Sequence, residues 1–513
     1  MTSLRTRPRN FLAGALAALM TVASHAAVAD DRVFDVVAPF EIGGLDPSIS
    51  GFVFQRMQIT ETLLEADANG NPLPALAEKW DVSADGKRWT FDIRPGVKFH
   101  DGTPLTAKAV AHSLQVAQGK TGMLRNADIT SISAEADKVV ILLAKPFAPL
   151  SALLAHSSTN ILAPASYDAA GNVQKIIGTG PYQLTLLEPP QRLAAQRFEH
   201  YWGTRPTIEK TTYLGAGRGE TRSLMAESGG AELVFQLDPP SIARLQRSKN
   251  TEVLMGPVPR VLVLAANSGS GETAPVEVRR ALSLAIQREG IAAAVLRAPG
   301  TGATQMFANN VAAWHDPDLA PLKYDPQAAR DLLKAQGWVL NSAGLLEKDG
   351  RPLRLKLITY SDRPELPLIA TAVQAQLREV GVDVEVAIEN ASAIPAAHND
   401  GTLQLALYGR NYALVPDPSV TLMADFGNGG AEWGPLGWNN PEFDTLMAQL
   451  LATTEPAQQQ LIRNRIAGLI QTDLPLIPIA WYRQSIAVSK EVVGASIDPF
   501  ERTFRLSTMR WAK

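Results

Sequence analysis

The chain has 513 residues, of which 46% are hydrophobic and 19% are charged, with 48 Lys and Arg against 51 Asp and Glu. This slightly acidic balance, without runs of like charge, excludes a generic nucleic-acid-binding protein. The sequence contains no cysteine, which excludes cysteine nucleophiles, Cys-metal sites and disulfides, so stability must come from a buried core.

The first 29 residues form a segment that is separate from the rest of the chain. Three Arg precede an apolar run at 11–23, and residues 27–29, Ala-Val-Ala, offer a small-x-small cleavage site. The run is too short to span a bilayer, because a transmembrane helix needs about 20 apolar residues. We therefore predict a cleaved secretory signal peptide at 1–29, with a cut after Ala26 as the alternative, and a periplasmic mature protein.

A hairpin dominates the first part of the mature chain. Residues 83–86, Ser-Ala-Asp-Gly, are typical of a tight turn, because Asp and Gly tolerate a left-handed backbone. Trp89, Phe91 and Ile93 then alternate with polar residues, which is the pattern of a half-buried strand. The sequence therefore predicts two strands joined at 83–86.

Further elements are predicted around this hairpin. Residues 57–64 indicate a helix that leads towards it. Thr106 is a suitable N-cap for a helix whose apolar residues follow helical spacing, and residues 139–143 are a candidate for a buried strand. Residues from about 70 to 165 should therefore form a hairpin-rich insert that contains a helix.

The second half of the chain alternates strands and helices. An apolar strand at 261–266 ends at Asn267, and an amphipathic helix follows at 278–286. Further on, Asp325 caps a helix that Pro326 opens.

The alternation continues towards the C-terminus. A helix at 369–380 ends at Gly381, and residues 382–388 then alternate as a strand. Two more helices are expected at 442–451 and 456–471. Helices followed by strands in this way predict an α/β lobe.

The segment 74–104 resembles the early signature of the extracellular solute-binding proteins of peptide- and nickel-type ABC importers (solute-binding protein family 5). In that family a W-x-x-S-x-D-G hairpin leads into R-x-G-V-K-F-H-D-G-T-P. The matching residues are Trp80, Ser83, Asp85, Gly86, Arg94, Gly96, Val97, Lys98, Phe99, His100, Asp101, Gly102, Thr103 and Pro104. Other segments similar to the family lie at 177–182, at 198–202, where His200 stands in place of the usual Asn, and at 278–291, 324–338 and 474–481.

The resemblance implies an α/β fold of the periplasmic-binding-protein type (type II, cluster C), with two lobes and an extra hairpin-rich subdomain in the first lobe. It implies a first lobe at 30–267, which includes the subdomain at about 70–165. A second lobe at 268–481 and a return to the first lobe at 482–513 follow. The implied function is that of the periplasmic substrate-binding component of an ABC importer, which captures a peptide or a nickel or other metal chelate by hinge closure and delivers it to an inner-membrane permease.

Catalysis and cofactor binding have little support in the sequence. There is no G-x-S-x-G elbow, no G-x-x-x-x-G-K-[ST] phosphate loop and no H-E-x-x-H helix. The His residues of the mature chain are not paired at i+3 or i+4, so no direct metal ligand is predicted. We expect no enzyme activity and no cofactor, apart from a metal chelate as transported ligand. A secreted hydrolase, or a sensing or chaperone-like periplasmic protein on the same fold, is the alternative.

The resemblance also implies where a ligand binds. Peptide-binding relatives hold the ligand's ammonium group with an acid in the segment 408–418, but here Leu414 aligns with that acid and Asp417 is the nearby substitute. Nickel-binding relatives have a pocket Arg in the segment equivalent to 153–164, where this chain has Ser157 and Asn160.

Aromatic and Arg side chains are the remaining candidates, because chelator carboxylates favour bidentate Arg contacts. The full set of candidate ligand-binding residues is Arg56, Tyr408, Arg410, Tyr412, Asp417, Trp433 and Trp438. We expect a monomer that binds a small solute and docks on the permease.

Overall fold

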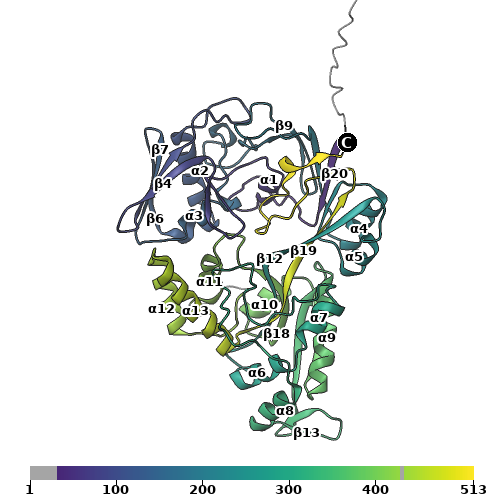
Figure 1. Ribbon diagram of the computed structural model, residues 1–513. Helices are drawn as coiled ribbons and strands as arrows, with labels where there is room; N and C mark the ends of the chain where they lie inside the picture. Colours follow the sequence, from purple (N-terminus) through teal and green to yellow (C-terminus); the bar gives the residue numbers. More distant parts are fainter. Residues whose placement is uncertain (1–31, 428–432, 513) are drawn as a thin grey trace, which may run out of the picture.

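The computed structural model describes residues 32–427 and 433–512, so the predicted signal peptide lies outside the described residues. Two bodies are stacked one above the other, and two long neighbouring strands, β12 (Thr251–Ala266) and β19 (Leu476–Ser489), run between them (Figure 1). The domain boundaries at 267 and 481 stay a prediction.

Among the described residues, a ten-stranded sheet continues through both bodies in the order β17-β16-β18-β12-β19-β11-β1-β10-β9-β8. Its other strands are β1 (Val33–Ala38), β8 (Tyr182–Glu188), β9 (Arg192–Arg197), β10 (Lys210–Gly215), β11 (Leu233–Phe235), β16 (Arg354–Tyr360), β17 (Asp383–Glu389) and β18 (Leu405–Asn411). The pairs β1–β10, β1–β11, β16–β17 and β16–β18 are parallel. Parallel pairs need crossover connections, which the helices supply.

The pairing of β12 with β19 changes register where the chain passes from one body to the other. The antiparallel ladder runs from Thr251 to Pro257, shifts before Val261 and again between Leu262 and Val263, and then continues to Ala265. The shift leaves residues of one strand without regular partners, which loosens and bends a ladder locally.

Helices cover both bodies (Figure 1). In the upper body they are α1 (Phe52–Arg56), α2 (Ala107–Gln118), α3 (Leu150–Leu153), α4 (Gly219–Ser228) and α5 (Pro239–Leu245). In the lower body they are α6 (Val276–Leu284), α7 (Arg288–Ala294), α8 (Pro326–Ala335), α9 (Glu365–Glu379), α10 (Ala393–Asn399), α11 (Pro418–Phe426), α12 (Pro441–Ala452) and α13 (Pro456–Asp473). The predicted helices at 278–286, 369–380, 442–451 and 456–471 are confirmed within a few residues, and so is the helix that Asp325 caps.

The upper body contains a second, four-stranded sheet in the order β4-β5-β7-β6. Its strands are β4 (Ala77–Val82), β5 (Arg88–Ile93), β6 (Ile129–Glu135) and β7 (Lys138–Leu143). β4 and β5 pair as an antiparallel hairpin, as predicted, and Gly86 in its turn has a φ of +69°. The Thr106 hydroxyl caps α2 by accepting a hydrogen bond from the Ala109 N–H at 3.1 Å.

The helix predicted at 57–64 is wrong. The helical segment here is α1, which ends at Arg56, and Gln58 follows it with a φ of +54° that an α-helix cannot contain. Residues from Leu64 onward form β2 (Leu64–Ala66), which pairs with β3 (Pro72–Pro74). The apolar residues of 57–64 are buried because neighbouring segments surround them, rather than because they share one face of a helix.

The small sheets are peripheral. They consist of β13 (Val339–Leu340), β14 (Leu346–Lys348) and β15 (Arg351–Pro352), and of β20 (Val492–Val493) with β21 (Arg510–Trp511). No helix among the described residues has both the length and the hydropathy that crossing a membrane requires.

Glu61 lies where two segments noted in the sequence meet. The Thr179 hydroxyl and the Trp202 indole N–H donate to its Oε2, at 2.7 Å and 3.0 Å, and the Tyr201 hydroxyl donates to its Oε1 at 2.9 Å. The turn at 177–182 and the segment at 198–202 are therefore joined through one carboxylate.

Candidate functional site

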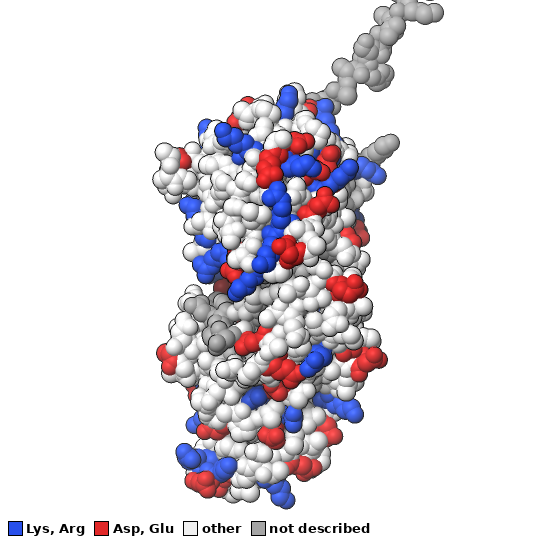
Figure 2. All heavy atoms as spheres, turned by 90° about the vertical axis from the view of Figure 1, so that its left-hand side faces the viewer, with Lys and Arg blue, Asp and Glu red and all other residues white. Residues whose placement is uncertain are grey.

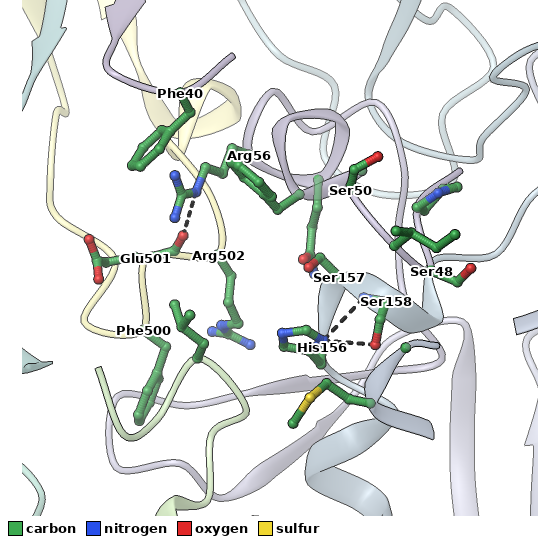
Figure 3. Close-up of a pocket in the computed structure, with 18 of the residues that line it drawn as sticks. Phe40, Ser48, Ser50, Arg56, His156, Ser157, Ser158, Phe500, Glu501 and Arg502 are labelled. Atoms are coloured by element: carbon green, nitrogen blue, oxygen red, sulfur yellow. Dashed lines mark hydrogen bonds between the residues drawn. The ribbon is translucent and has the colours of Figure 1, made fainter. Parts of the chain in front are cut away.

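A cavity of about 460 Å³ lies where the upper and lower bodies meet (Figure 3). The upper body supplies the loop after β1, the helix α1 and two further loops, and the lower body supplies the loops that follow β16 and β18. The strand β12 and the C-terminal segment at 500–502 complete the lining. The segments that line the cavity are Phe40, 47–52, Gln55, Arg56, 121–123, 156–158, Arg260, Arg363, Leu414 and 500–502. A cavity between two bodies is the usual place for a small ligand.

Arg56, at the end of α1, is the central cation of the cavity. Its side chain is buried, and its guanidinium lies over the rings of Phe40 and Phe52 at 4.0 Å and 5.0 Å from their centroids. Its Nε donates to the backbone carbonyl of Glu501 at 2.8 Å, whereas its Nη1 has no hydrogen-bond partner. Among the described residues no carboxylate lies within ion-pair distance of Arg56, and burial lowers its pKa.

Arg260, on β12, forms a buried ion pair with Glu501. Its Nη2 donates to Glu501 Oε2 at 2.7 Å, and the Asn411 amide donates to the same oxygen at 2.6 Å. Burial alone would raise the pKa of Glu501, but the surrounding guanidiniums outweigh burial and hold that pKa below its ordinary value. Glu501 therefore stays ionised and is engaged within the protein.

Two more Arg complete the cationic lining. Arg502 Nη1 pairs with Glu65 Oε2 at 2.9 Å, and its Nη2 donates to a backbone carbonyl. Arg363 Nη1 lies 3.9 Å from Glu365 Oε1. Both of these cations have carboxylate partners, which distinguishes them from Arg56.

His156 faces the interior of the cavity with the edge that carries Nε2 (Figure 3). Its Nδ1 lies 3.1 Å from the Ser158 backbone N–H and 2.9 Å from the Ser158 hydroxyl. Because the N–H can only donate, Nδ1 accepts, and the neutral ring carries its proton on Nε2. Burial lowers the pKa of His156 to about 4, so the ring is a neutral hydrogen-bond donor at physiological pH.

The electrostatic character of the cavity is positive. Among the described residues that line it, four are Arg and Glu501 is the acid. On the face in Figure 2, a band of Lys and Arg side chains runs down the upper body with Asp and Glu side chains beside it, and both signs are also mixed on the lower body. No group of three or more His, Asp or Glu that could hold a metal ion occurs among the described residues.

The structure brings only part of the predicted site together. Arg56 lines the cavity, and so do Leu414 and Ser157. Asn160 is buried beside it in the upper body and does not line it. Asp417 lines a neighbouring cavity, where its Oδ1 caps α11 through the Ser419 N–H at 2.9 Å.

Tyr408, Arg410 and Trp433 lie outside the cavity, in the lower body, where Tyr408 belongs to the hydrophobic core, Trp433 packs against it and Arg410 is partly exposed. The Tyr408 hydroxyl donates to the Trp433 carbonyl at 2.8 Å, and their rings pack edge to face. Arg410 forms a bidentate ion pair with Asp425, in which both N–O distances are 2.6 Å. Arg410 is therefore paired within the protein in this structure, and its contact with a ligand, predicted as an alternative to that of Arg56, stays a prediction.

Tyr412 and Trp438 are placed in the same core. Both rings pack against Phe426, and the Trp438 indole N–H donates to Asp473 at 3.0 Å. Neither residue lines the cavity. A contact of these aromatic residues with a ligand stays a prediction.

Besides Arg56, sequence reasoning missed the charged and His residues that line the cavity: Arg260, Arg363, Glu501, Arg502 and His156. Arg260 offered a signal, because it is the charged residue within the apolar run at 257–266. A buried Arg in such a strand needs a partner. The other residues lie on loops far apart in the chain and carry no local signal.

Comparison with known proteins gave consistent matches. The model of the family described as bacterial extracellular solute-binding proteins, family 5 middle, matches residues 71–433. The nickel-binding periplasmic protein of Escherichia coli K12 is 28% identical over 505 residues, which is 93% of this chain and 94% of that protein. The dipeptide-binding protein of the same organism is 27% identical and covers 83% of this chain and 84% of its own length.

Among solved structures, NikA from Brucella suis in complex with Fe(III)-EDTA is similar to this chain. It superposes with a TM-score of 0.86 at 27% identity and covers 94% of this chain and 100% of its own.

Proposed function

The chain belongs to the bacterial extracellular solute-binding proteins of family 5 and has their mixed α/β two-lobe fold, and on this premise we propose that it delivers an anionic solute to an ABC importer. The solute would be a metal chelate or a similar compound with several carboxylates. It would bind in the cavity between the two bodies, in the periplasm, and the closed protein would then dock on the inner-membrane permease.

Arg56 carries this proposal. A buried guanidinium without a carboxylate partner is costly, because a desolvated charge is stable only when it is paired and hydrogen-bonded. Its aromatic neighbours stack on the guanidinium but supply no negative charge. A carboxylate of the ligand would supply that charge and would accept a hydrogen bond from Nη1, for which the protein offers no partner.

A metal chelate fits this lining better than a simple peptide does. The ammonium group of a peptide needs an acceptor, but in this cavity Leu414 stands at the position of the acid that the family resemblance implies, and Asp417 lines the neighbouring cavity instead. Glu501 already accepts hydrogen bonds from Arg260 and Asn411. Chelators such as EDTA present carboxylates on several sides, and the Brucella suis protein was solved with Fe(III)-EDTA.

Binding without turnover is part of the proposal. Acid-base hydrolysis needs two carboxyl groups whose environments separate their pKa values. Among the described residues that line the cavity, only Glu501 carries a carboxyl group. We therefore propose neither a hydrolase nor a resident cofactor, and the metal enters as part of the cargo.

The test is calorimetric titration of the mature protein with Fe(III)-EDTA, Ni(II) with L-histidine, and a dipeptide. We expect a chelate to bind. Arg56→Gln should weaken chelate binding about 10- to 100-fold, because a hydrogen bond to a charged group contributes about 1.5–3 kcal/mol. Arg56→Lys keeps the charge but loses the fork geometry of the guanidinium, so its affinity for the chelate should lie between those of the wild type and Arg56→Gln.

Arg88→Gln is the matched control, because Arg88 is exposed on the distant hairpin, where it pairs with Glu135. It should leave affinity unchanged. Wild-type affinity in a folded Arg56→Gln variant, judged by its circular dichroism, would contradict the proposal. Tight binding of the dipeptide alone would indicate a peptide carrier instead.

A further inference from the structure

A second cavity, of about 330 Å³, lies beside the first one, and Phe500 lines both. Its walls come from the β2–β3 turn and the start of α3 in the upper body, and from the loop at 310–314, the start of α11 and the helix α13 in the lower body. Both bodies therefore contribute to it, as they do to the first cavity.

Polar atoms without partners gather in its lining. Trp314 Nε1, Asn310 Oδ1 and Arg463 Nε are buried and have no hydrogen-bond partner. The Trp314 side chain is only 1% exposed. Buried polar atoms are nearly always paired with protein or with ordered water, and two donors and one acceptor that lie together without protein partners fit an occupant of matching chemistry.

Arg463 resembles Arg56 in its surroundings. Its guanidinium lies 5.9 Å from the centroid of the Trp314 ring, and its Nη2 donates to the Gln459 side chain at 3.2 Å. Among the described residues no carboxylate lies within ion-pair distance of Arg463. The acid that lines this cavity is Asp417, whose Oδ1 caps α11.

Building on the proposed function, we propose that the second cavity binds the amino-acid-like end of an elongated anionic solute whose other acid group binds at Arg56. The carboxylate of that end would accept from Arg463 and Trp314, and its ammonium or N–H would donate to Asn310 and Asp417. Phe500 would pack against the chain that links the two ends. The cargo class is therefore an amino acid conjugate with a second carboxylate at its far end.

The experiment compares L-α-amino diacids of increasing length, from L-glutamate through L-2-aminoadipate to L-2-aminosuberate, each with the matched diacid that lacks the amino group. Affinities are measured by calorimetry. In the wild type, the longer amino diacids should bind at least about tenfold more tightly than their matched diacids. Arg463→Gln should abolish this preference.

Arg465→Gln is the control, since Arg465 lies on the same helix but is exposed and pairs with Glu442 at 2.5 Å. It should keep the preference for amino diacids. Asn310→Ala is a second test that leaves the charges unchanged, and it should weaken the amino diacids but not the matched diacids.

An unchanged preference in folded Arg463→Gln and Asn310→Ala variants would overturn the inference. A second result would also overturn it: a protein that binds chelates through Arg56 but shows no preference for amino diacids. That result would leave the proposed function intact. If neither chelates nor diacids bind, the proposed function itself fails.

Discussion

Glu61 is a partly buried carboxylate that ties two loops of the upper body together. Burial raises its pKa to about 7, although the three side chains that donate to it lower the pKa in part. The folded protein therefore holds the Glu61 proton more tightly than the unfolded chain does. Its contribution to stability is complete below about pH 4.5 and is lost as the pH rises to about 7.

Glu61→Gln should remove this pH dependence, because an amide does not ionise but can still accept from Trp202 and Thr179. The free energy of unfolding of the wild type, minus that of the variant, should fall by about 2 kcal/mol between about pH 5 and pH 7.5. Urea titrations at a series of pH values measure this difference. Glu135→Gln, at an exposed position, is the control. If the difference in free energy of unfolding between the wild type and Glu61→Gln does not change with pH, Glu61 is not the source of the pH dependence.

The contacts of single side chains also explain why most of the predicted site residues lie outside the first cavity. Arg410 has the side chain that a carboxylate ligand prefers, but Asp425, on α11, already pairs with it. Residue type alone predicts the chemistry that a side chain can perform. It does not reveal whether a protein partner has already satisfied that side chain.

The helix α2 shows how far local sequence determines an element. Thr106→Ala should lower the free energy of unfolding by about 1 kcal/mol, because the first turn loses the acceptor for the Ala109 N–H. Thr106→Ser keeps the hydroxyl and should stay within a few tenths of a kcal/mol of the wild type. Urea unfolding followed by circular dichroism measures both, and an equal loss in both variants would assign the effect to the methyl group instead.

Elements with strong local signals were predictable from the sequence. The 83–86 turn, the Thr106 cap and the Asp325 cap each fix a boundary through residues within a few positions of one another. The segment 57–64 was not predictable in this way, because its burial comes from contacts with distant segments. Local patterns therefore determine elements only where local contacts dominate.

The residues that line the first cavity could not be predicted from local patterns, because distant segments bring them together. Arg56 and Glu501 meet across 445 positions of the chain, and Arg260 and Glu501 across 241. Only the path of the backbone brings them together. The sequence could indicate that a cleft exists, through the family resemblance, but it could not show which Arg lacks a protein partner.

At the scale of the whole molecule, the two bodies touch beyond the strands that connect them. The Ala148 N–H, before α3, donates to the Leu451 carbonyl on α12 at 2.8 Å. Val415 and Val420, beside and within α11, belong to the hydrophobic cluster of the hairpin-rich subdomain. These contacts close the edge of the cleft, and we infer that this conformation is a closed one, with the register shift in β12 as the hinge.

Gly70 gives a way to test that inference. It lies in the β2–β3 turn with a φ of +88°, and a Cβ there would be 2.5 Å from the Pro416 carbonyl oxygen in the lower body. Gly70→Ala should therefore wedge the bodies apart and weaken ligand binding about tenfold or more, since a ligand held by both bodies favours the closed state. Calorimetry gives the affinity, and small-angle scattering should show a larger radius of gyration.

Gly96→Ala separates the wedge from the strain of the backbone. Gly96 has a similar φ of +77°, but nothing lies within 4 Å of the position that its Cβ would take. Both variants should lose about 1 kcal/mol of stability, because a left-handed backbone disfavours alanine. Only Gly70→Ala should also lose affinity, because only there does the added methyl group meet the opposite body. Equal affinities in the two variants would mean that the contact at Pro416 does not limit closure.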